Sequence, residues 1–308
     1  ALLAALGSSR QLACALVFSC FFASMFVTND VALLTFVPFA LLVLKKTGAQ
    51  RTLIPVVVLQ TVAANLGSMC TPVGNPQNLY LYMVSGMGLA EFVKLLLPYT
   101  LISLLLLAAS LCLIPDERLS AASLELEPGG AKYPGWKLAA FCCLFALCMA
   151  AVLRLADYRL VFLVVAGSVF CVERKLFAKA DYVLLLTFAA FFIFVGNVKN
   201  IPAVNEFLVS RTSGHEFLVA LTASQFISNV PAAVLLARFT HGWQGLMLGT
   251  DLGGLGTLVA SMASLISYKF YCSADGADRG RYLAVFTAVN LAYLAVLVAA
   301  AWLLCGFR

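Results

Sequence analysis

Residues 11–46 read QLACALVFSCFFASMFVTNDVALLTFVPFALLVLKK, an apolar run interrupted near its middle by the polar tripeptide Thr28-Asn29-Asp30. A bilayer core about 30 Å thick takes about 20 apolar residues in one helix. The run is too long for one span, and each of its halves is short for one. We therefore predict a re-entrant hairpin over 11–45. Irregular backbone is tolerated within a membrane only where it lines a protected cavity, so the tip is a candidate binding site.

The composition predicts an all-α polytopic membrane protein. Of the 308 residues 63% are hydrophobic and 11% are charged, whereas a soluble domain has about 45–50% apolar and about 25% charged residues. We expect a multi-pass protein of the plasma membrane, embedded in the lipid bilayer. The net charge of +6 comes from Lys and Arg in short loops between apolar runs. Positive-inside topology explains this better than nucleic acid does, so no nucleic-acid partner is expected.

Two further features bear on what the chain contains. The first nine residues, ALLAALGSS, resemble the end of an earlier helix rather than a signal peptide. We expect one or more N-terminal spans to be missing, although removal of an initiator Met would look the same. The ten Cys form no CxxC pair and lie mostly in apolar runs, where Cys acts as a small hydrophobe. We expect no metal, disulfide or cofactor chemistry from them.

Glycine and proline divide the rest of the chain. The segment AANLGSMCTPVGNPQN (63–78) cannot lie in a continuous helix interior, so we predict a helix over 52–64, an unwound centre and a helix from about 78. A second break is centred on GTDLGGLGTLVASMAS (249–264). The predicted first repeat (1–114) has hairpin 11–45, broken span 52–84 and span 92–114. A cytoplasmic loop, 115–137, follows it. The predicted second repeat (138–308) has spans 138–153, 160–172 and 181–197, a polar loop 197–216, hairpin 216–240, broken span 241–268 and span 282–305.

The two halves share an internal repeat. FVTNDVALL (26–34) aligns with FISNVPAAVLL (226–236), and ANLGSMCTPVG (64–74) aligns with TDLGGLGTLVA (250–260). The alignment matches Thr28 with Ser228, Asn29 with Asn229, Asn65 with Asp251, Gly67 with Gly253, and Thr71 with Thr257. An odd number of predicted crossings separates the units, so they face opposite ways. Inverted repeats with discontinuous helices are typical of secondary transporters.

These motifs resemble the ion-transporter superfamily that contains divalent anion–sodium symporters, citrate transporters, arsenite-efflux permeases and a sodium–proton antiporter family. The loop TPVGNPQN (71–78) is similar to the TPxGxPxN loop of the anion symporters, and the hairpin tips are similar to their Ser-Asn-Thr motifs. The chain departs from this pattern at Asp30 and at Val230-Pro231, and GTDLGGLGT (249–257) looks more like the arsenite-efflux branch. These departures leave the substrate open.

The resemblance implies that each tip and its break form one coordination site, with Na⁺ held at Thr28, Asn29, Gly67, Ser228 and Asn229. The chemistry of the residues agrees, because freed carbonyls suit a hard cation and half-helix N-termini suit an oxyanion. The alternative is that the polar residues only cap kinks and pack helices. The predicted ion- and substrate-binding residues are Thr28, Asn29, Asp30, Asn65, Gly67, Thr71, Gly74, Asn75, Gln77, Asn78, Ser228, Asn229, Asp251, Gly253 and Thr257.

Asp30 and Asp251 are the acids that we place deep in the apolar zone. An intramembrane carboxylate is costly and indicates function, so either acid could bind Na⁺ or carry a proton. Asp30 could instead serve only as a helix cap. No Lys or Arg lies in the tips or breaks, so an anionic substrate would depend on helix dipoles and bound cations.

The sequence therefore predicts a secondary active transporter, not an enzyme. It would move a small anion or oxyanion (a carboxylate or an arsenite-like species) by alternating access, coupled to Na⁺ or H⁺. The alternative within the superfamily is a Na⁺/H⁺ antiporter. A membrane enzyme would need a nucleophile, metal cluster or cofactor motif, and we find none in the apolar segments. The resemblance also implies a homodimer.

Overall fold

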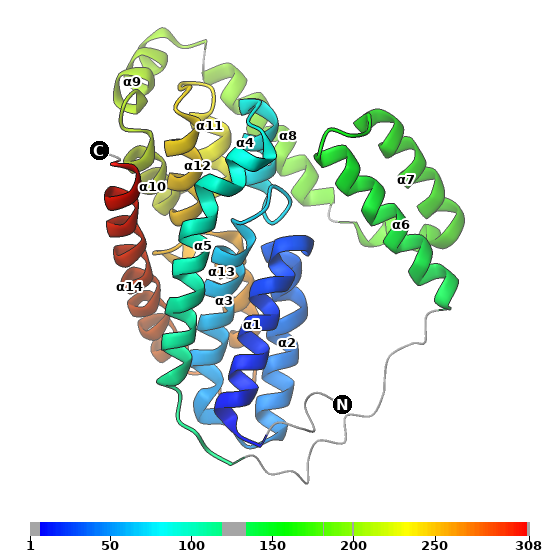
Figure 1. Cartoon of the computed structure of the whole chain (residues 1–308), viewed down its shortest axis with the longest axis vertical. Coiled ribbons are helices and arrows are strands. Elements are labelled where there is room, and N and C mark those ends of the chain that lie inside the picture. The colour runs from blue at the N-terminus through cyan, green and yellow to red at the C-terminus, as the bar shows by residue number, and fades with distance from the viewer. Residues whose placement is uncertain (1–6, 119–133, 181, 199, 307–308) are drawn as a thin grey trace. The chain divides into compact units, whose positions relative to one another are not determined.

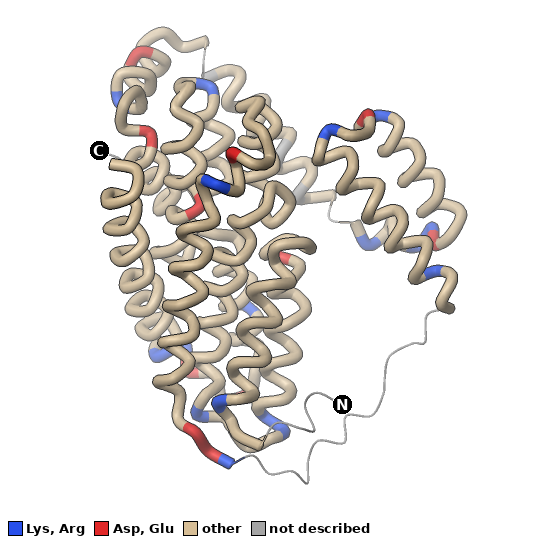
Figure 2. Tube along the Cα trace, viewed as in Figure 1, with Lys and Arg blue, Asp and Glu red and all other residues tan. Residues whose placement is uncertain are grey.

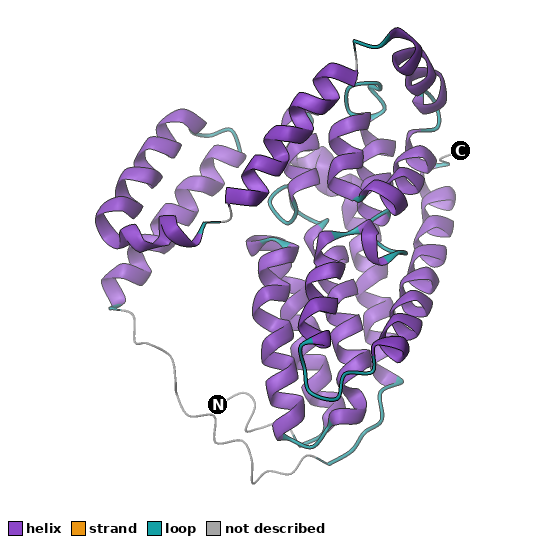
Figure 3. Ribbon diagram, turned by 180° about the vertical axis from the view of Figure 1, so that it is seen from behind, coloured by secondary structure: helices purple, strands orange, loops and turns teal. Residues whose placement is uncertain are grey.

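The computed structural model describes residues 7–118, 134–180, 182–198 and 200–306, and every regular element in these ranges is a helix (Figure 3). Four of these helices are long and apolar enough to cross a membrane, namely α1 (Ser9–Val27), α5 (Leu89–Cys112), α6 (Gly135–Val152) and α14 (Arg279–Cys305). Lys and Arg gather mainly near helix ends, with few along the helices (Figure 2). The prediction of an all-α polytopic membrane protein is confirmed.

Contacts group the described residues into two units, a first within 1–125 and 195–308 and a second within 126–194. In the first unit α1, α2, α3 and α5 run side by side (Figure 1). The other elements of this unit include the helices on either side of the two predicted breaks and the helices of the second hairpin. Besides α1, α5 and α14, the first unit contains α2 (Asn29–Lys46), η2 (Gln50–Thr52), α3 (Leu53–Ser68), α4 (Pro76–Ser85), α9 (Pro202–Thr212), α10 (Glu216–Ile227), α11 (Asn229–Leu236), α12 (Trp243–Leu252), η5 (Leu258–Ala260) and α13 (Met262–Cys272).

The second unit contains α6, α7 (Tyr158–Glu173), η4 (Arg174–Lys179) and most of α8 (Tyr182–Val198). Asp157 caps α7 by accepting hydrogen bonds from two backbone N–H groups of its first turn. An ion pair between Lys137 Nζ and Glu173 Oε2, 2.6 Å long, joins the start of α6 to the end of α7. The apolar side chains of these helices are largely exposed, as expected for surfaces that face lipid.

Each hairpin turns on a single residue. Thr28 joins α1 to α2 with φ 70° and ψ 150°, and Ser228 joins α10 to α11 with φ 70° and ψ 151°. A positive φ is uncommon outside glycine, so each tip needs support from its surroundings. The Thr28 side chain supplies part of it by accepting a hydrogen bond from the backbone N–H of Val31.

The first hairpin is longer than expected. Its helices have 19 and 18 residues, so each is about 27 to 29 Å long. The expectation that each half is short for a span is wrong for α1, which is long and apolar enough to cross a membrane. The reason is that a one-residue tip lets both helices continue to Thr28, while α1 extends outward to Ser9. The next residue, Arg10, donates from its Nε to the Ile114 carbonyl. The second hairpin does have short helices, of 12 and 8 residues.

Both breaks are narrower than predicted. Helix α3 continues to Ser68, so Asn65 and Gly67 are helical and the unwound segment is 69–75. Gly67 is accommodated within the helix because α1 passes so close that a Cβ atom there would lie 2.3 Å from the Phe21 carbonyl oxygen. Helix α12 likewise includes Asp251 in its last turn.

Other helix and hairpin boundaries in the second half also differ from the predicted ones. The segment expected as a polar loop over 197–216 contains α9, which begins with Pro202 at a position where proline suits a helix. The second hairpin ends at Leu236 rather than 240, and the second broken span runs from Trp243 to Cys272. Of the predicted loop 115–137, residues 119–133 lie outside the described residues, and α6 already begins at Gly135.

The helices that follow the breaks pack reciprocally. Helix α4 contacts α11 and α12 from the second half of the sequence, while α13 contacts α2 and α3 from the first half. A buried cluster around Val57, Ala64, Ala263 and Tyr282 fills the α2–α3–α13–α14 interface. This packing brings both breaks into one core. The opposite orientation of the two halves in the membrane stays a prediction.

The substitution Gly67→Ala tests the close contact between α1 and α3. The added methyl group would meet backbone atoms of Phe21, and such overpacking costs about 1–3 kcal/mol. We expect a lower melting temperature for the purified protein. Gly88→Ala is the matched control, because nothing lies within 4 Å of that site. Equal melting temperatures for the two variants would contradict the close packing.

Candidate ion and substrate site

The first polar centre forms around Asn65 on α3. Its Oδ1 accepts hydrogen bonds from Asn29 Nδ2 at 3.3 Å and from Ser261 Oγ at 3.0 Å. The backbone N–H of Asn29 also donates to the Gly74 carbonyl at 2.9 Å. Asn29, Asn65 and Ser261 are all buried. The first tip, the first break and the start of α13 therefore meet at one point.

The second polar centre forms around Asp251, a residue that is 3% exposed. Its Oδ1 accepts from Asn75 Nδ2 at 3.3 Å and from Gln77 Nε2 at 3.4 Å. Asn75 also caps α4, because its Oδ1 accepts from the backbone N–H of Asn78 at 2.8 Å. A carboxylate from the second half of the chain thus faces the N-terminus of α4, where the helix dipole favours negative charge.

Ser68 joins the two centres. Its Oγ accepts from Asn75 Nδ2 at 3.3 Å and donates to the Asn65 carbonyl at 2.9 Å. A continuous path of hydrogen-bonded residues therefore runs from Asn29 at the first tip, through Asn65, Ser68 and Asn75, to Asp251.

Several buried polar atoms of this network have no hydrogen-bond partner. They are Asp251 Oδ2, Gln77 Oε1, Asn78 Oδ1 and Asn65 Nδ2. Buried polar atoms are normally paired, so these four are open positions for a ligand or water. Three are oxygens of the kind that hard cations prefer, and the fourth is an amide donor suited to an anion. The residues present therefore fit a cation such as Na⁺ beside Asp251.

The second tip is held like the first. Thr257 Oγ1 donates to the Gln225 carbonyl at 3.0 Å, as Thr71 Oγ1 donates to the Met25 carbonyl. Each carbonyl lies three residues before its tip, so both threonines anchor a break to the hairpin beside it. Ser228 Oγ donates to the Ala260 carbonyl at 3.4 Å, and buried Asn229 lies against Gly254.

The remaining predicted residues have other surroundings. Gly67 and Gly253 make close packing contacts, with α1 and with Ser224 respectively. Asp30 is only half-buried, and its backbone N–H donates to Asn29 Oδ1 at 2.9 Å. The backbone of Asp30 is therefore hydrogen-bonded within the tip. Asp30 is not part of the hydrogen-bonded path from Asn65 to Asp251. Whether Thr28, Asn29, Gly67, Ser228 and Asn229 hold Na⁺ stays a prediction.

Three residues of the site were missed in the sequence. Ser68 and Ser261 belong to the network above, and Gln225 Nε2 donates to the carbonyls of Gly253 and Leu255 at 2.9 and 3.0 Å. Extending the repeat alignment by one position pairs Ser261 with Asn75, so that signal was present. Gln225 is a polar residue three positions before a tip. Nothing in the sequence distinguished Ser68 from other small residues.

The chain is similar in sequence to known transporters. The model of a family described as citrate transporter matches residues 1–265. The chain belongs to this citrate transporter family. It is 30% identical to the uncharacterized transporter MJ0456 of Methanocaldococcus jannaschii over 96% of this chain and 80% of that protein. It is also 30% identical to the inner membrane protein YbiR of Escherichia coli K12, over 85% of this chain and 70% of that protein.

A third relative, a 46 kDa membrane protein of Mycobacterium leprae, is 24% identical over 87% of this chain and 71% of its own length. The family and the four apolar helices show an integral, multi-pass membrane protein. Family and relatives together identify a secondary transporter of the anion and carboxylate class. The superfamily resemblance seen in the motifs is confirmed.

The substitution Asn75→Asp tests the contact between Asn75 and Asp251. It keeps an acceptor for capping α4 but places a second carboxylate beside Asp251. Two like charges about 4 Å apart repel by on the order of 4 kcal/mol at an effective dielectric constant of 20. We expect a less stable protein near neutral pH. Its stability should recover as the pH is lowered, because protonation of either acid removes the repulsion.

Asn75→Ser is the control, since serine also caps helices and adds no charge. Thermal unfolding of purified protein between pH 5 and pH 8 is the measurement. If Asn75→Asp and Asn75→Ser have the same stability at every pH, Asn75 does not face a charged Asp251.

Proposed function

We propose that this protein carries a small carboxylate across the membrane together with a coupling cation, Na⁺ or H⁺, by alternating access. The observation that carries the proposal is the meeting of helix N-termini at one buried polar network. Helices α2, α4 and α13 begin at Asn29, Pro76 and Met262, beside hydrogen-bonded members of the network. Helix α11 begins at the second tip and packs on α4.

These N-termini supply the attraction for an anion. Each carries a partial positive charge of about half an elementary charge, which favours a bound carboxylate. No Lys or Arg lies at the described tips and breaks (28–30, 65–78, 228–229 and 251–261). Oriented dipoles and amide groups would therefore bind the substrate, which favours a small anion of low charge or one neutralised by a bound cation.

Asp251 supplies the attraction for the cation. It lies in the last turn of α12, where the helix dipole is negative. A buried intramembrane carboxylate is costly without a cation or proton. One site thus offers binding groups for both signs of charge, and an anion and its coupling cation would reduce each other's cost of burial.

A second candidate function is Na⁺/H⁺ antiport. It is favoured by the three unpartnered oxygens of Asp251, Gln77 and Asn78, which could bind a cation or a proton in turn without any anion. The plasma-membrane location and the homodimer also stay proposals.

Flux measurements in proteoliposomes distinguish the two functions. Radiolabelled citrate, succinate and arsenite are supplied with a Na⁺ gradient, a pH gradient or neither. We expect uptake of a carboxylate that depends on one of the gradients. Proton movement driven by Na⁺ in the absence of any anion, with no uptake of the three probes, would overturn the carboxylate proposal and support antiport.

The two tips are tested by Asn29→Ala and Asn229→Ala. Loss of a hydrogen bond to a charged ligand costs about 1.5–3 kcal/mol. The transport rate of each variant should therefore fall by about tenfold or more, while the protein remains folded. Ser103→Ala is the control, because Ser103 is buried and donates only to the Tyr99 carbonyl of its own helix. Full flux in both asparagine variants would remove the tips from the mechanism.

A further inference from the structure

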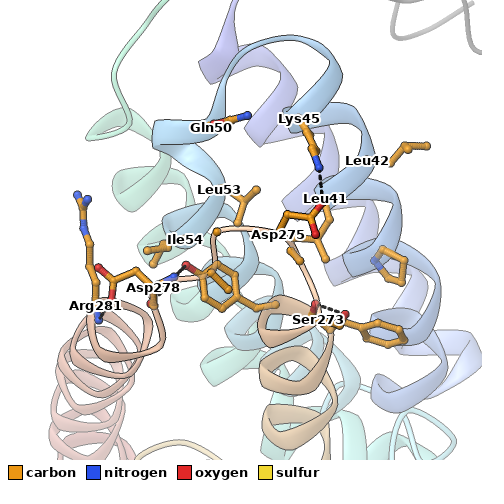
Figure 4. Close-up of a pocket in the computed structure, with 16 residues that line it drawn as sticks. Leu41, Leu42, Lys45, Gln50, Leu53, Ile54, Ser273, Asp275, Asp278 and Arg281 are labelled. Atoms are coloured by element: carbon orange, nitrogen blue, oxygen red, sulfur yellow. Dashed lines mark hydrogen bonds and ion pairs between the residues drawn. The ribbon is translucent and has the colours of Figure 1, made fainter.

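A cavity of about 490 Å³ opens at the end of the first unit where α2 and α13 end and where α3 and α14 begin (Figure 4). Helices α2 and α13 pack on each other, so both halves of the sequence line the cavity. Helix α14 begins at Arg279 and is long and apolar enough to cross a membrane, so its first turn is expected at a membrane surface. The cavity is therefore expected at the level of the lipid headgroups.

The inner wall of the cavity is apolar and leads to a cation. On α2, the residues that line it are Pro38, Leu41, Leu42 and Lys45, whose spacing of i, i+3, i+4 and i+7 places them on one face of a helix. This α2 stripe is about 10 Å long. Leu42 is 48% exposed, so the stripe is open to its surroundings. The apolar wall is completed by Leu53, Ile54 and Phe270.

The rim of the cavity is charged, and its two acids already have partners. Lys45 Nζ lies 2.9 Å from Asp275 Oδ2. Asp278 Oδ1 accepts a hydrogen bond from the backbone N–H of Arg281 at 2.9 Å and so caps α14. The guanidinium of Arg281 forms no ion pair with any of the described residues. The rim thus offers one unpaired cation and one cation held by a single exposed acid.

More cations surround this rim. Lys46 lies in the last turn of α2, Lys269 lies in the last turn of α13, and Arg279 begins α14. All three are exposed. Together with the two cations that line the cavity they make five, against the two acids of the rim. A surplus of cations at a membrane surface attracts anionic headgroups, so charge and position together favour an anionic ligand that comes from the membrane.

We propose that this cavity binds one anionic phospholipid, with its phosphate held by Lys45 and Arg281 and one acyl chain lying along the α2 stripe. Charged donors form strong hydrogen bonds to phosphate, and arginine can form two in parallel. The exposed pair between Lys45 and Asp275 is no obstacle, because an exposed ion pair contributes little to stability. A soluble anion would use the rim alone, whereas a lipid uses the apolar stripe as well.

This site is separate from the polar network around Asp251. None of the residues that line the cavity belongs to the hydrogen-bonded path from Asn29 to Asp251. The proposal therefore does not depend on which substrate or coupling ion is transported.

The internal repeat provides a second cavity for comparison. Continuing the repeat alignment pairs Tyr271, which lines the first cavity, with Ser85, which lines a cavity of about 450 Å³. The titratable residues of this second cavity are Glu91, Glu216 and His241, and no described Lys or Arg lines it. Its carboxylates would repel a phosphate. We therefore expect the lipid at the first cavity alone, on the face that positive-inside topology predicts to be cytoplasmic.

The test is native mass spectrometry of the purified protein in detergent, titrated with phosphatidylglycerol. We expect the parent to retain one phosphatidylglycerol at concentrations at which phosphatidylcholine, which has no net charge, is not retained. The double variant Lys45→Gln, Arg281→Gln should bind phosphatidylglycerol roughly tenfold or more weakly, because both charged contacts to phosphate are lost. The matched control is Lys46→Gln, Arg279→Gln, which removes the same charge from the same rim without changing a residue that lines the cavity. It should bind like the parent.

A third variant and two competitors complete the test. Asp275→Asn removes the acid that competes for Lys45, so it should bind phosphatidylglycerol several-fold more tightly than the parent. Glycerol phosphate and citrate, each in large molar excess, should leave the bound lipid in place, because neither has an acyl chain for the α2 stripe.

Five results would each overturn the proposal. They are equal binding by the parent and Lys45→Gln, Arg281→Gln; equal loss of binding in the control; equal retention of phosphatidylcholine; unchanged or weaker binding in Asp275→Asn; and displacement of the lipid by glycerol phosphate or citrate, which would indicate a site for soluble anions.

Discussion

The contact between the Asp251 carboxylate and the amide groups at the start of α4 is the interaction on which the rest of the site depends. An isolated charge buried in a membrane protein is expensive, and its cost falls only when hydrogen bonds and dipoles replace the lost water. Asn75 and Gln77 supply the hydrogen bonds, and the N-terminus of α4 supplies the dipole. Because the acid and the amides come from different halves of the chain, this contact ties the two breaks together.

The breaks are possible because each is anchored to a neighbouring hairpin. Thr71 and Thr257 bind carbonyls three residues before their tips, and the Asn29 N–H binds the Gly74 carbonyl. Unwound backbone inside a membrane must find such partners within the protein. The same need explains the tight glycines: an added Cβ at Gly74 would lie 1.9 Å from the Ser68 carbonyl oxygen. The irregular backbone is therefore held in place while its helix ends point into the core.

Much of this arrangement could be predicted from the sequence, because polar residues within apolar runs are informative in a membrane protein. The Thr-Asn and Ser-Asn tips, the break at TPVGNPQN and the acid at 251 all stand out against apolar neighbours, and the internal repeat pairs them. Helix lengths could not be predicted as well. The segment 63–78, rich in Gly, Pro and Asn, predicts that the helix ends at 64, whereas α3 continues to Ser68 and Gly67 fits closely against α1. The polar composition of 197–216 concealed α9.

The finer contacts depended on tertiary structure. Ser68 is a common residue type at an ordinary helical position, and only the fold places it between Asn65 and Asn75. The same holds for Ser261, which reaches Asn65 only because α13 packs on α3. Asp30 is the opposite case. Its position at a tip predicts a binding residue, but the hydrogen-bonded path from Asn65 to Asp251 does not include it.

An experimental structure of the protein in lipid nanodiscs with citrate tests the central claim most directly. We expect density for the anion at the N-termini of the helices that begin at the tips and breaks, in contact with Asn29, Asn75 or Asn229 and close to Asp251. Citrate density elsewhere, for example in the cavity beside Lys45 and Arg281, with the polar network unchanged from that of the protein without ligand, would contradict it.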